Sequence, residues 1–456
     1  MSGKPNARSP GPACAALLVV ALATAPAVHA QDVSWARSAS MAGADFALTR
    51  GVAAVELNPA NIFIEDSVAF SFSSTLQAGR VLVAGPGLRQ FADIVTASGV
   101  GDPALLAEVP TGGLRIDAVS EGVTAKRIAE TLDLPDPTGG ARVPTFGFTY
   151  KGGGFVFRQH TVLSALVSRE LIDLAVNGFN PDQINEYAAK STAIRSFTLT
   201  SATVSFSKRY SERLTGGFGI RYVRGEKLLT GRVFEPEIDV DNEVFAASAA
   251  AIEARGGNGL GLDLGVTYQL GRTLYASLAI QNVWQRMHWS DQLWVSQSAL
   301  SQDDFGASDL RTIINRFKAS KLDVEAATLE AYLTSQDLYG GAFFPRITRA
   351  GIGWRARNGT ELQLTGAKSW GRGTLIPARP DRVAAGVNYP WKVLRLRSGF
   401  ALEQGGARQI AFGIAFDGGL SIDLGGGWTQ GSGKLGSIHG LSFSLGVSLV
   451  FTEVGS

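Results

Sequence analysis

Few residues in this sequence have the types and spacing that chemistry requires. A hydrolytic site needs a nucleophile beside a positioned base, and the only local pair of that kind is His439 with Ser442 or Ser444. No phosphate-binding Gly-Lys-Ser/Thr loop, no His-Glu-x-x-His and no paired-cysteine metal motif occurs. The single cysteine is Cys14. The sequence therefore predicts a protein that is not an enzyme, with no cofactor, no catalytic residue and no metal site.

The charge balance excludes a second class of function. The chain has 42 Lys and Arg against 40 Asp and Glu, which leaves a net charge of +2. Nucleic-acid-binding domains gather a clear excess of basic residues into a patch, so we expect no nucleic-acid partner. Glycine is abundant, with 55 residues in 456, against a usual share of about 7%.

The first 30 residues have the organisation of a secretory signal peptide. Lys4 and Arg8 give a positive start, an apolar run covers Ala15–Ala25, and cleavage is expected before Gln31. Cys14 leaves with this segment. Beyond it, no run of 18 or more apolar residues could form a membrane-spanning helix. An exported chain of this kind is either a soluble periplasmic protein or an outer-membrane barrel.

A period of two favours the barrel. From Leu260 to Leu270, large apolar residues alternate with Gly, Asp, Thr and Gln, so one face of a strand is oily and the other is small and polar. The pattern recurs along the chain and predicts about 14 to 16 strands, each of roughly 9–11 residues, the length that crosses a bilayer. A soluble sandwich would instead expose charges on its outer face.

Charges and tryptophans occupy consistent places in this pattern. We expect most charges on the polar face to pair with one another in a lumen and not to line a substrate path; they are Arg221, Asp263, Arg355, Arg395, Arg397, Glu403 and Asp423. The tryptophans near strand ends predict aromatic girdles at the membrane surfaces, with ordinary core packing as the alternative for any one of them; they are Trp284, Trp289, Trp294, Trp354, Trp370, Trp391 and Trp428.

Helical insertions are expected near 88–132, 166–190 and 300–339. In the last of these, apolar residues repeat at helical spacing after Ser308, and a second short helix is capped by Ser320 or Asp323. Such amphipathic helices need a partner surface: the barrel's own loops, its mouth, a ligand or the membrane interface. The residues that we propose for an apolar ligand mouth are Ile314, Phe317, Leu322, Leu329 and Leu333.

The final strand carries a second signal. Ser444, Gly446, Leu449 and Phe451 combine a polar residue, a following glycine and an alternating apolar end. This resembles the C-terminal signal that the barrel-assembly machinery reads. A five-residue tail, 452–456, follows the aromatic residue at which many barrel chains stop.

The mature N-terminus carries the most informative motif. Small residues surround Met41-Ala42-Gly43, and Asn58-Pro59-Ala60 follows. Together they resemble the N-terminal hatch of the FadL-type family of outer-membrane transporters for long-chain fatty acids and hydrocarbons. The resemblance implies a 14-stranded barrel whose lumen holds the hatch residues Met41, Gly43, Asn58, Pro59 and Ala60.

These observations predict an all-β transmembrane antiparallel barrel in the bacterial outer membrane. Its parts are a signal peptide (1–30), a hatch (31–66), a barrel of about 14 strands (67–451) and the tail. The expected function is porin-like, passive uptake of hydrophobic small molecules, with the lipid bilayer and the barrel-assembly machinery as partners. The alternative is a barrel that anchors, shuttles or supports a secretion, conjugation or surface complex through an unknown protein partner.

Overall fold

The computed structural model describes twelve stretches of the chain, and everything below concerns these. They are residues 35–63, 68–84, 114–120, 145–167, 193–239, 244–301, 321–323, 344–370, 381–404, 408–416, 420–430 and 438–452.

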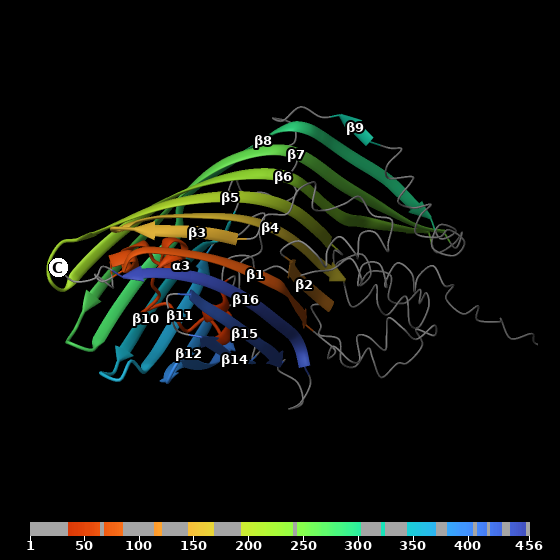
Figure 1. Ribbon diagram of the computed structural model, residues 1–456. Helices are drawn as coiled ribbons and strands as arrows, with labels where there is room; N and C mark the ends of the chain where they lie inside the picture. The colour runs from red at the N-terminus through yellow and green to blue at the C-terminus, as the bar shows by residue number, and fades with distance from the viewer. Residues whose placement is uncertain are drawn as a thin grey trace, which may run out of the picture.

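The described residues form one antiparallel sheet and a small inner segment (Figure 1). The strands are β1 (Val68–Ala84), β2 (Leu114–Ser120), β3 (Thr145–Tyr150), β4 (Gly153–Val167), β5 (Ala193–Arg209), β6 (Leu214–Asp239), β7 (Val244–Gln269), β8 (Leu274–Ser301), β9 (Lys321–Asp323), β10 (Arg346–Arg355), β11 (Glu361–Trp370), β12 (Arg382–Trp391), β13 (Leu394–Glu403), β14 (Arg408–Phe416), β15 (Leu420–Gln430) and β16 (Ile438–Thr452). Before them lie helix α2 (Ala36–Ser40), helix α3 (Val52–Leu57) and the 3-10 turn η1 (Pro59–Phe63).

The strand pairings lead round the lumen. β1 pairs with β16, successive strands pair back to β10, β10 pairs with β8, and the order continues down to β4. Between β4 and β1 lie both β2 and β3, which share one position. Among the described strands, β9 pairs with β8 alone. In the described part of the chain this gives fourteen positions in the wall, and it confirms the expected antiparallel barrel fold.

Two features of the wall differ from expectation. The residue pattern predicts one strand start near Val244 and a second at Leu260, but both lie in the single strand β7, because the Ala-rich and Gly-rich stretches between them interrupt the alternation. The predicted strand length of 9–11 residues fits β10 to β15, whereas β6, β7 and β8 have 26, 26 and 28 residues. These three strands extend far beyond β10–β14 toward one end of the barrel (Figure 1).

Strands also occur inside the expected helical insertions. β2 lies within 88–132 and β9 within 300–339, where Lys321–Asp323 was expected to begin a helix. Apart from these strands, most of the insertions near 88–132, 166–190 and 300–339 lies outside the described residues. Among the described residues, no helix has both the length and the apolar character needed to cross a membrane.

The wall has two ends of different character. At one end the strands are joined by short turns, such as Lys151–Gly152 between β3 and β4 and the turn between β7 and β8. At the other end the connections are longer, including 168–192 and 302–343. We call these the short-turn end and the long-connection end. The C-terminal end of β16 lies at the short-turn end, where Val68 pairs with Thr452.

Large apolar side chains point outward on the wall strands whose side chains the structure describes. The outward residues on β7 are the predicted ones: Leu260, Leu264, Val266 and Tyr268 are exposed, whereas Asp263 is fully buried on the other face. Exposed apolar residues of the same kind recur on β10 to β15. The inner, polar face of the wall is covered by α2, α3 and η1. The buried core of this protein therefore lies in the lumen.

Candidate functional site

The inner segment, residues 35–63, fills the lumen. Helix α2 packs against β13 to β16, α3 against β1 and β3 to β5, and η1 against β5 to β7. One short stretch of chain therefore contacts strands from β13 round to β7 from inside the lumen. Helix α3 is seen inside the ring in Figure 1. All five expected hatch residues lie in this segment. Met41, Asn58, Pro59 and Ala60 are buried, and Gly43 is half-buried.

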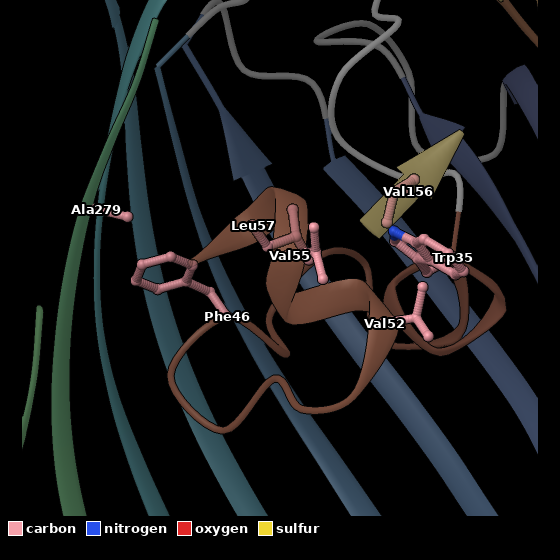
Figure 2. Packing of buried hydrophobic residues seen from close by; sticks show 7 residues of the cluster. All are labelled: Trp35, Phe46, Val52, Val55, Leu57, Val156 and Ala279. Atoms are coloured by element: carbon pink, nitrogen blue, oxygen red, sulfur yellow. The ribbon is translucent and has the colours of Figure 1, made fainter. Parts of the chain in front are cut away.

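An apolar cluster gives the segment its own core. Figure 2 shows the side chains converging around α3 from the inner segment and from the wall. Its members are Trp35, Phe46, Val52, Val55, Leu57, Val156 of β4 and Ala279 of β8. Apolar burial contributes about 25 cal/mol per Å², so this cluster stabilises the position of the segment in the lumen. Apolar contacts have no preferred direction, so the orientation of the segment must come from other contacts.

Asn58 and Asn61 fix the orientation of the segment. The Asn58 side chain accepts from the backbone N–H of Ala60, 3.2 Å away, and donates to the Thr267 hydroxyl of β7 at 3.1 Å. Asn61 donates to the carbonyls of Phe46 and Ala47 at 3.1 and 3.3 Å. Both asparagines are fully buried. The Asn-Pro-Ala motif therefore ties η1 to the wall and to the preceding loop of the segment.

The Met41-Ala42-Gly43 stretch is a tight turn. Ala42 and Gly43 both have positive φ, at 50° and 72°, a conformation that glycine adopts without strain. Arg382 of β12 donates to the Ala42 carbonyl at 2.6 Å, and its guanidinium occupies the space that a Cβ on Gly43 would need. A larger residue at position 43 would displace Arg382.

Wall glycines make room for the segment. At nine of them in the described strands, an added Cβ would stand closer than 3.0 Å to an atom of the inner segment. These are Gly147, Gly154, Gly217, Gly265, Gly353, Gly386, Gly399, Gly413 and Gly425. They lie on nine different strands. Nine of the 55 glycines of the sequence thus allow the close approach of wall and segment.

Glu361 at the start of β11 gathers arginines at the short-turn end. Its carboxylate lies 2.5 Å from Arg37 of α2, 2.6 Å from Arg50 and 3.3 Å from Arg355. Asn388 of β12 donates to it at 3.1 Å. The burial of Arg37 disfavours its charge, but the carboxylates of Glu361 and Asp45 outweigh this and raise the pKa of Arg37.

A second ion pair ties the segment to the opposite wall. Arg158 of β4 lies 2.5 Å from Glu56 of α3, and both side chains are at least nine-tenths buried. The Trp35 indole donates to the same carboxylate at 3.2 Å, and the Arg158 guanidinium lies over the Trp35 ring at 5.6 Å. Three parts of the chain that are distant in sequence meet here.

The remaining lumen charges are also paired. Arg221 lies 2.6 Å from Asp263, at a β-bulge where Asn282 has φ 55° and donates its backbone N–H to Asp263. Arg397 lies 2.6 Å from Asp423. Of the other charges expected on this face, Glu403 is buried, and Arg395 and Arg355 are half-buried. These contacts agree with the expectation of paired lumen charges.

The tryptophans divide between two environments. Trp284, Trp354, Trp370 and Trp391 are exposed on the outer face, as the girdle prediction requires. Trp289 is buried instead, where its ring lies beside the backbone of glycines in β6 and β7. Trp289 therefore follows the alternative of ordinary core packing, because its parity places it on the lumen face. Trp428 is half-buried.

The structure places the other expected site residues as follows. In β16, Ser444 and Gly446 are buried, Leu449 is exposed on the outer face, and Phe451 pairs through its backbone with Phe70 of β1. Of the expected ligand mouth, the backbone of Leu322 lies in β9. Ile314, Phe317, Leu329 and Leu333 lie outside the described residues.

The ion pairs of the inner segment were not found from the sequence. Arg37, Arg50 and Glu56 gave the only available signal, which is that charged residues interrupt a stretch otherwise rich in small and apolar residues. Such charges need buried partners, but their partners Glu361 and Arg158 lie 324 and 102 residues away from Arg37 and Glu56. No local spacing connects them.

The fold and its contents define a class: an antiparallel β-barrel with its own N-terminal segment packed in the lumen. A FadL homologue from Pseudomonas aeruginosa has this fold, with a TM-score of 0.50 at 12% identity, covering 93% of this chain and 99% of that one. The Ralstonia pickettii toluene transporter TbuX gives 0.49 at 12% identity, covering 93% and 99%. The CymD monoaromatic hydrocarbon channel gives 0.48 at 11%, covering 93% and 99%. The sequence matches no family model and no curated protein. The barrel fold that the FadL resemblance implied is therefore confirmed.

Proposed function

We propose that this chain is an outer-membrane channel for the passive uptake of hydrophobic small molecules, with residues 35–63 as the hatch that closes its lumen. The observation that carries the proposal is the inner segment itself. A barrel that served only as an inert support would need no separate segment packed against nine strands through glycine contacts. A removable or deformable plug is what a regulated passage requires.

The outer face supports placement in a membrane. Its exposed side chains are large and apolar, and tryptophans occur among them near strand ends. Bacterial barrels have short turns on the periplasmic side and longer loops outside, so the long-connection end faces the exterior. Export would remove residues 1–30, and the barrel-assembly machinery would read the end of β16.

Among the described strands, an interval in the pairing between β1 and β4 suggests where the ligand leaves. β3 pairs with β1 as far as Thr75, and β2 resumes the pairing at Arg80. On the other side, β4 pairs with β3 as far as Phe157 and with β2 from Thr161. Residues 76–79 of β1 and 158–160 of β4 flank this interval in the ladder. A hydrophobic ligand that left the lumen here would enter the bilayer directly and avoid water.

The hatch touches this interval through Arg158. Because Arg158 follows Phe157 directly and binds Glu56, a shift of α3 would change the wall at the point of interruption. We propose that ligand arriving from the long-connection end displaces part of the hatch and thereby reaches the interval. Diffusion down the concentration gradient then suffices to drive uptake.

A reversible crosslink tests whether the hatch must move. An added Cβ on Gly351 would stand 3.2 Å from the Cβ of Ala47, close to the roughly 3.5–4.5 Å that a disulfide spans. The pair Ala47→Cys and Gly351→Cys would lock the hatch to β10, and the expected mature chain has no cysteine of its own. We expect uptake of a labelled fatty acid or hydrocarbon to fall on oxidation and to recover on reduction, with each single cysteine variant unaffected.

Deletion of residues 38–61 completes the test. Uptake should then change while the barrel remains folded. Equal uptake by cells with the intact chain, with the hatchless chain and with no chain would exclude transport.

The alternative is a barrel that anchors or supports a complex. One observation favours it: buried ion pairs of Glu361 with its arginines, and of Arg397 with Asp423, lie near the short-turn end of the lumen. In that case the deletion would leave uptake unchanged and would reduce recovery of a partner protein.

A further inference from the structure

The outer face has a hollow near the long-connection end of β10 to β13. Ala350 and Gly366 are direct cross-strand partners, and both point outward. Along the same face, Ile352 is paired with Leu364 on the short-turn side. Because Ala350 and Gly366 are much smaller than Ile352 and Leu364, the outer layer of side chains has a depression at the smaller pair.

The hollow is large enough for part of a ligand. Its volume is about 520 Å³, within the roughly 300–1,000 Å³ of small-molecule sites. Exposed apolar side chains of Val383 and Leu402 border it. A Cβ on Gly366 would meet only the Ala350 carbonyl oxygen, at 4.0 Å, so the floor is open and not filled by neighbours.

Polar groups lie between the hollow and the rim. Lys368 follows two residues after Gly366, and its Nζ lies 4.5 Å from the centre of the Trp370 ring. The Trp370 indole donates to the Thr348 hydroxyl at 3.1 Å. Asp381 approaches Lys368 at 3.7 Å, but both side chains are more than a third exposed. This pair is therefore loose and open to a competing anion.

Two further cations stand on the same rim. Arg346 is exposed at the start of β10, where its guanidinium donates to the Val283 carbonyl at 2.9 Å. Arg408 is exposed at the start of β14. Arg382 and Glu403 also line the hollow, so the described residues here have four cations, Lys368, Arg346, Arg408 and Arg382, against the two carboxylates of Asp381 and Glu403. The rim thus carries a local excess of positive charge directly above an apolar hollow.

We propose that this hollow is a binding site for a phosphate-bearing lipid of the surrounding leaflet. An acyl chain lies on Ala350 and Gly366 between Val383 and Leu402, and Lys368 and Arg346 bind the phosphate. The order along the strands, apolar toward mid-wall and cationic at the rim, matches the order of tail and headgroup in a bilayer. The inference rests on the membrane placement proposed above and is independent of transport.

The test uses the full chain in nanodiscs of phosphatidylcholine that contain a minor fraction of phosphatidylglycerol. Native mass spectrometry after release measures which lipid the protein retains. We expect preferential retention of phosphatidylglycerol. Lys368→Gln should lower this preference roughly fivefold, since each cation near an anionic surface contributes about that factor. Gly366→Leu, which fills the hollow without a backbone clash, should abolish retention of both lipids.

Matched controls lie elsewhere on the outer face. Lys208→Gln removes a lysine that lies over the Tyr210 ring at the short-turn end, and Ala202→Leu adds an outward side chain on β5; neither should change retention. Failure to insert into nanodiscs would contradict the membrane placement. Insertion without any preference for phosphatidylglycerol, or an equal loss in the control variants, would overturn the lipid site alone.

Discussion

Gly399 of β13 lies against the backbone of Met41, so that a Cβ on Gly399 would stand 2.1 Å from the Met41 carbonyl carbon. The obstructing atoms belong to backbone and cannot rotate away. Met41 itself is fully buried. The first half of the hatch can therefore pack against β13 because residue 399 has no side chain.

Gly399→Ala should unseat this half of the hatch. Because interiors are close-packed, we expect a loss of about 1–3 kcal/mol in the free energy of unfolding and cleavage of residues 35–50 by added protease. The control is Gly271→Ala in the turn between β7 and β8, where an added Cβ meets nothing within 4 Å. Equal protease resistance of Gly399→Ala and the unmodified protein would contradict the prediction.

Thr267→Val tests the polar attachment of the other half. The Thr267 hydroxyl contacts Asn58, Asn61 and Ser277, so valine would remove one hydrogen-bond partner from each of two buried amide side chains. We expect a loss of about 1–3 kcal/mol, measured by denaturant unfolding. Asn58→Ala should cost a similar amount. The double variant should cost less than the two losses added together, since both remove one interaction; strict additivity would show that the two side chains act separately.

Leu264→Arg tests the assignment of the outer face. Leu264 is exposed in the middle of the spanning part of β7, so arginine there should cost about 2–4 kcal/mol. Leu270→Arg is the matched control: it is equally apolar and exposed but lies at the short-turn rim, where the cost falls to about 0–1 kcal/mol. Folding yields in lipid vesicles measure both. Equal tolerance of arginine at the two positions would mean that Leu264 does not face lipid.

Glu56→Leu should be more damaging than removal of both members of its ion pair. The single change leaves Arg158 buried without its carboxylate, which we expect to cost about 3–5 kcal/mol. The double variant Glu56→Leu with Arg158→Met replaces the pair by apolar groups and should recover most of that loss. Unfolding of both variants in urea measures the difference. A double variant no more stable than the single one would show that Arg158 holds the wall through contacts other than Glu56.

Local pattern predicted much of this protein. Alternation along 260–270 gave the outward face of β7 correctly, because side-chain direction in a strand depends only on residue parity. The same rule divided β7 into two strands, because the Ala-rich and Gly-rich stretches between Val244 and Leu260 interrupt the alternation. Residue type alone left two environments open for Trp289, and its parity in β8 places it in the lumen.

The sequence by itself determined the class of fold, the two faces of the wall and a small-residue N-terminal segment with an Asn-Pro-Ala motif. All of these follow from the alternation of apolar and polar residues and from residue types within short stretches of sequence. Only the tertiary structure decided that β2 and β3 share one wall position, that Glu361 meets Arg37 and Arg50, and that Gly399 receives Met41. These contacts depend on the register of strands that are far apart in the chain, and register is set by ring closure and packing around the hatch, which no local pattern encodes.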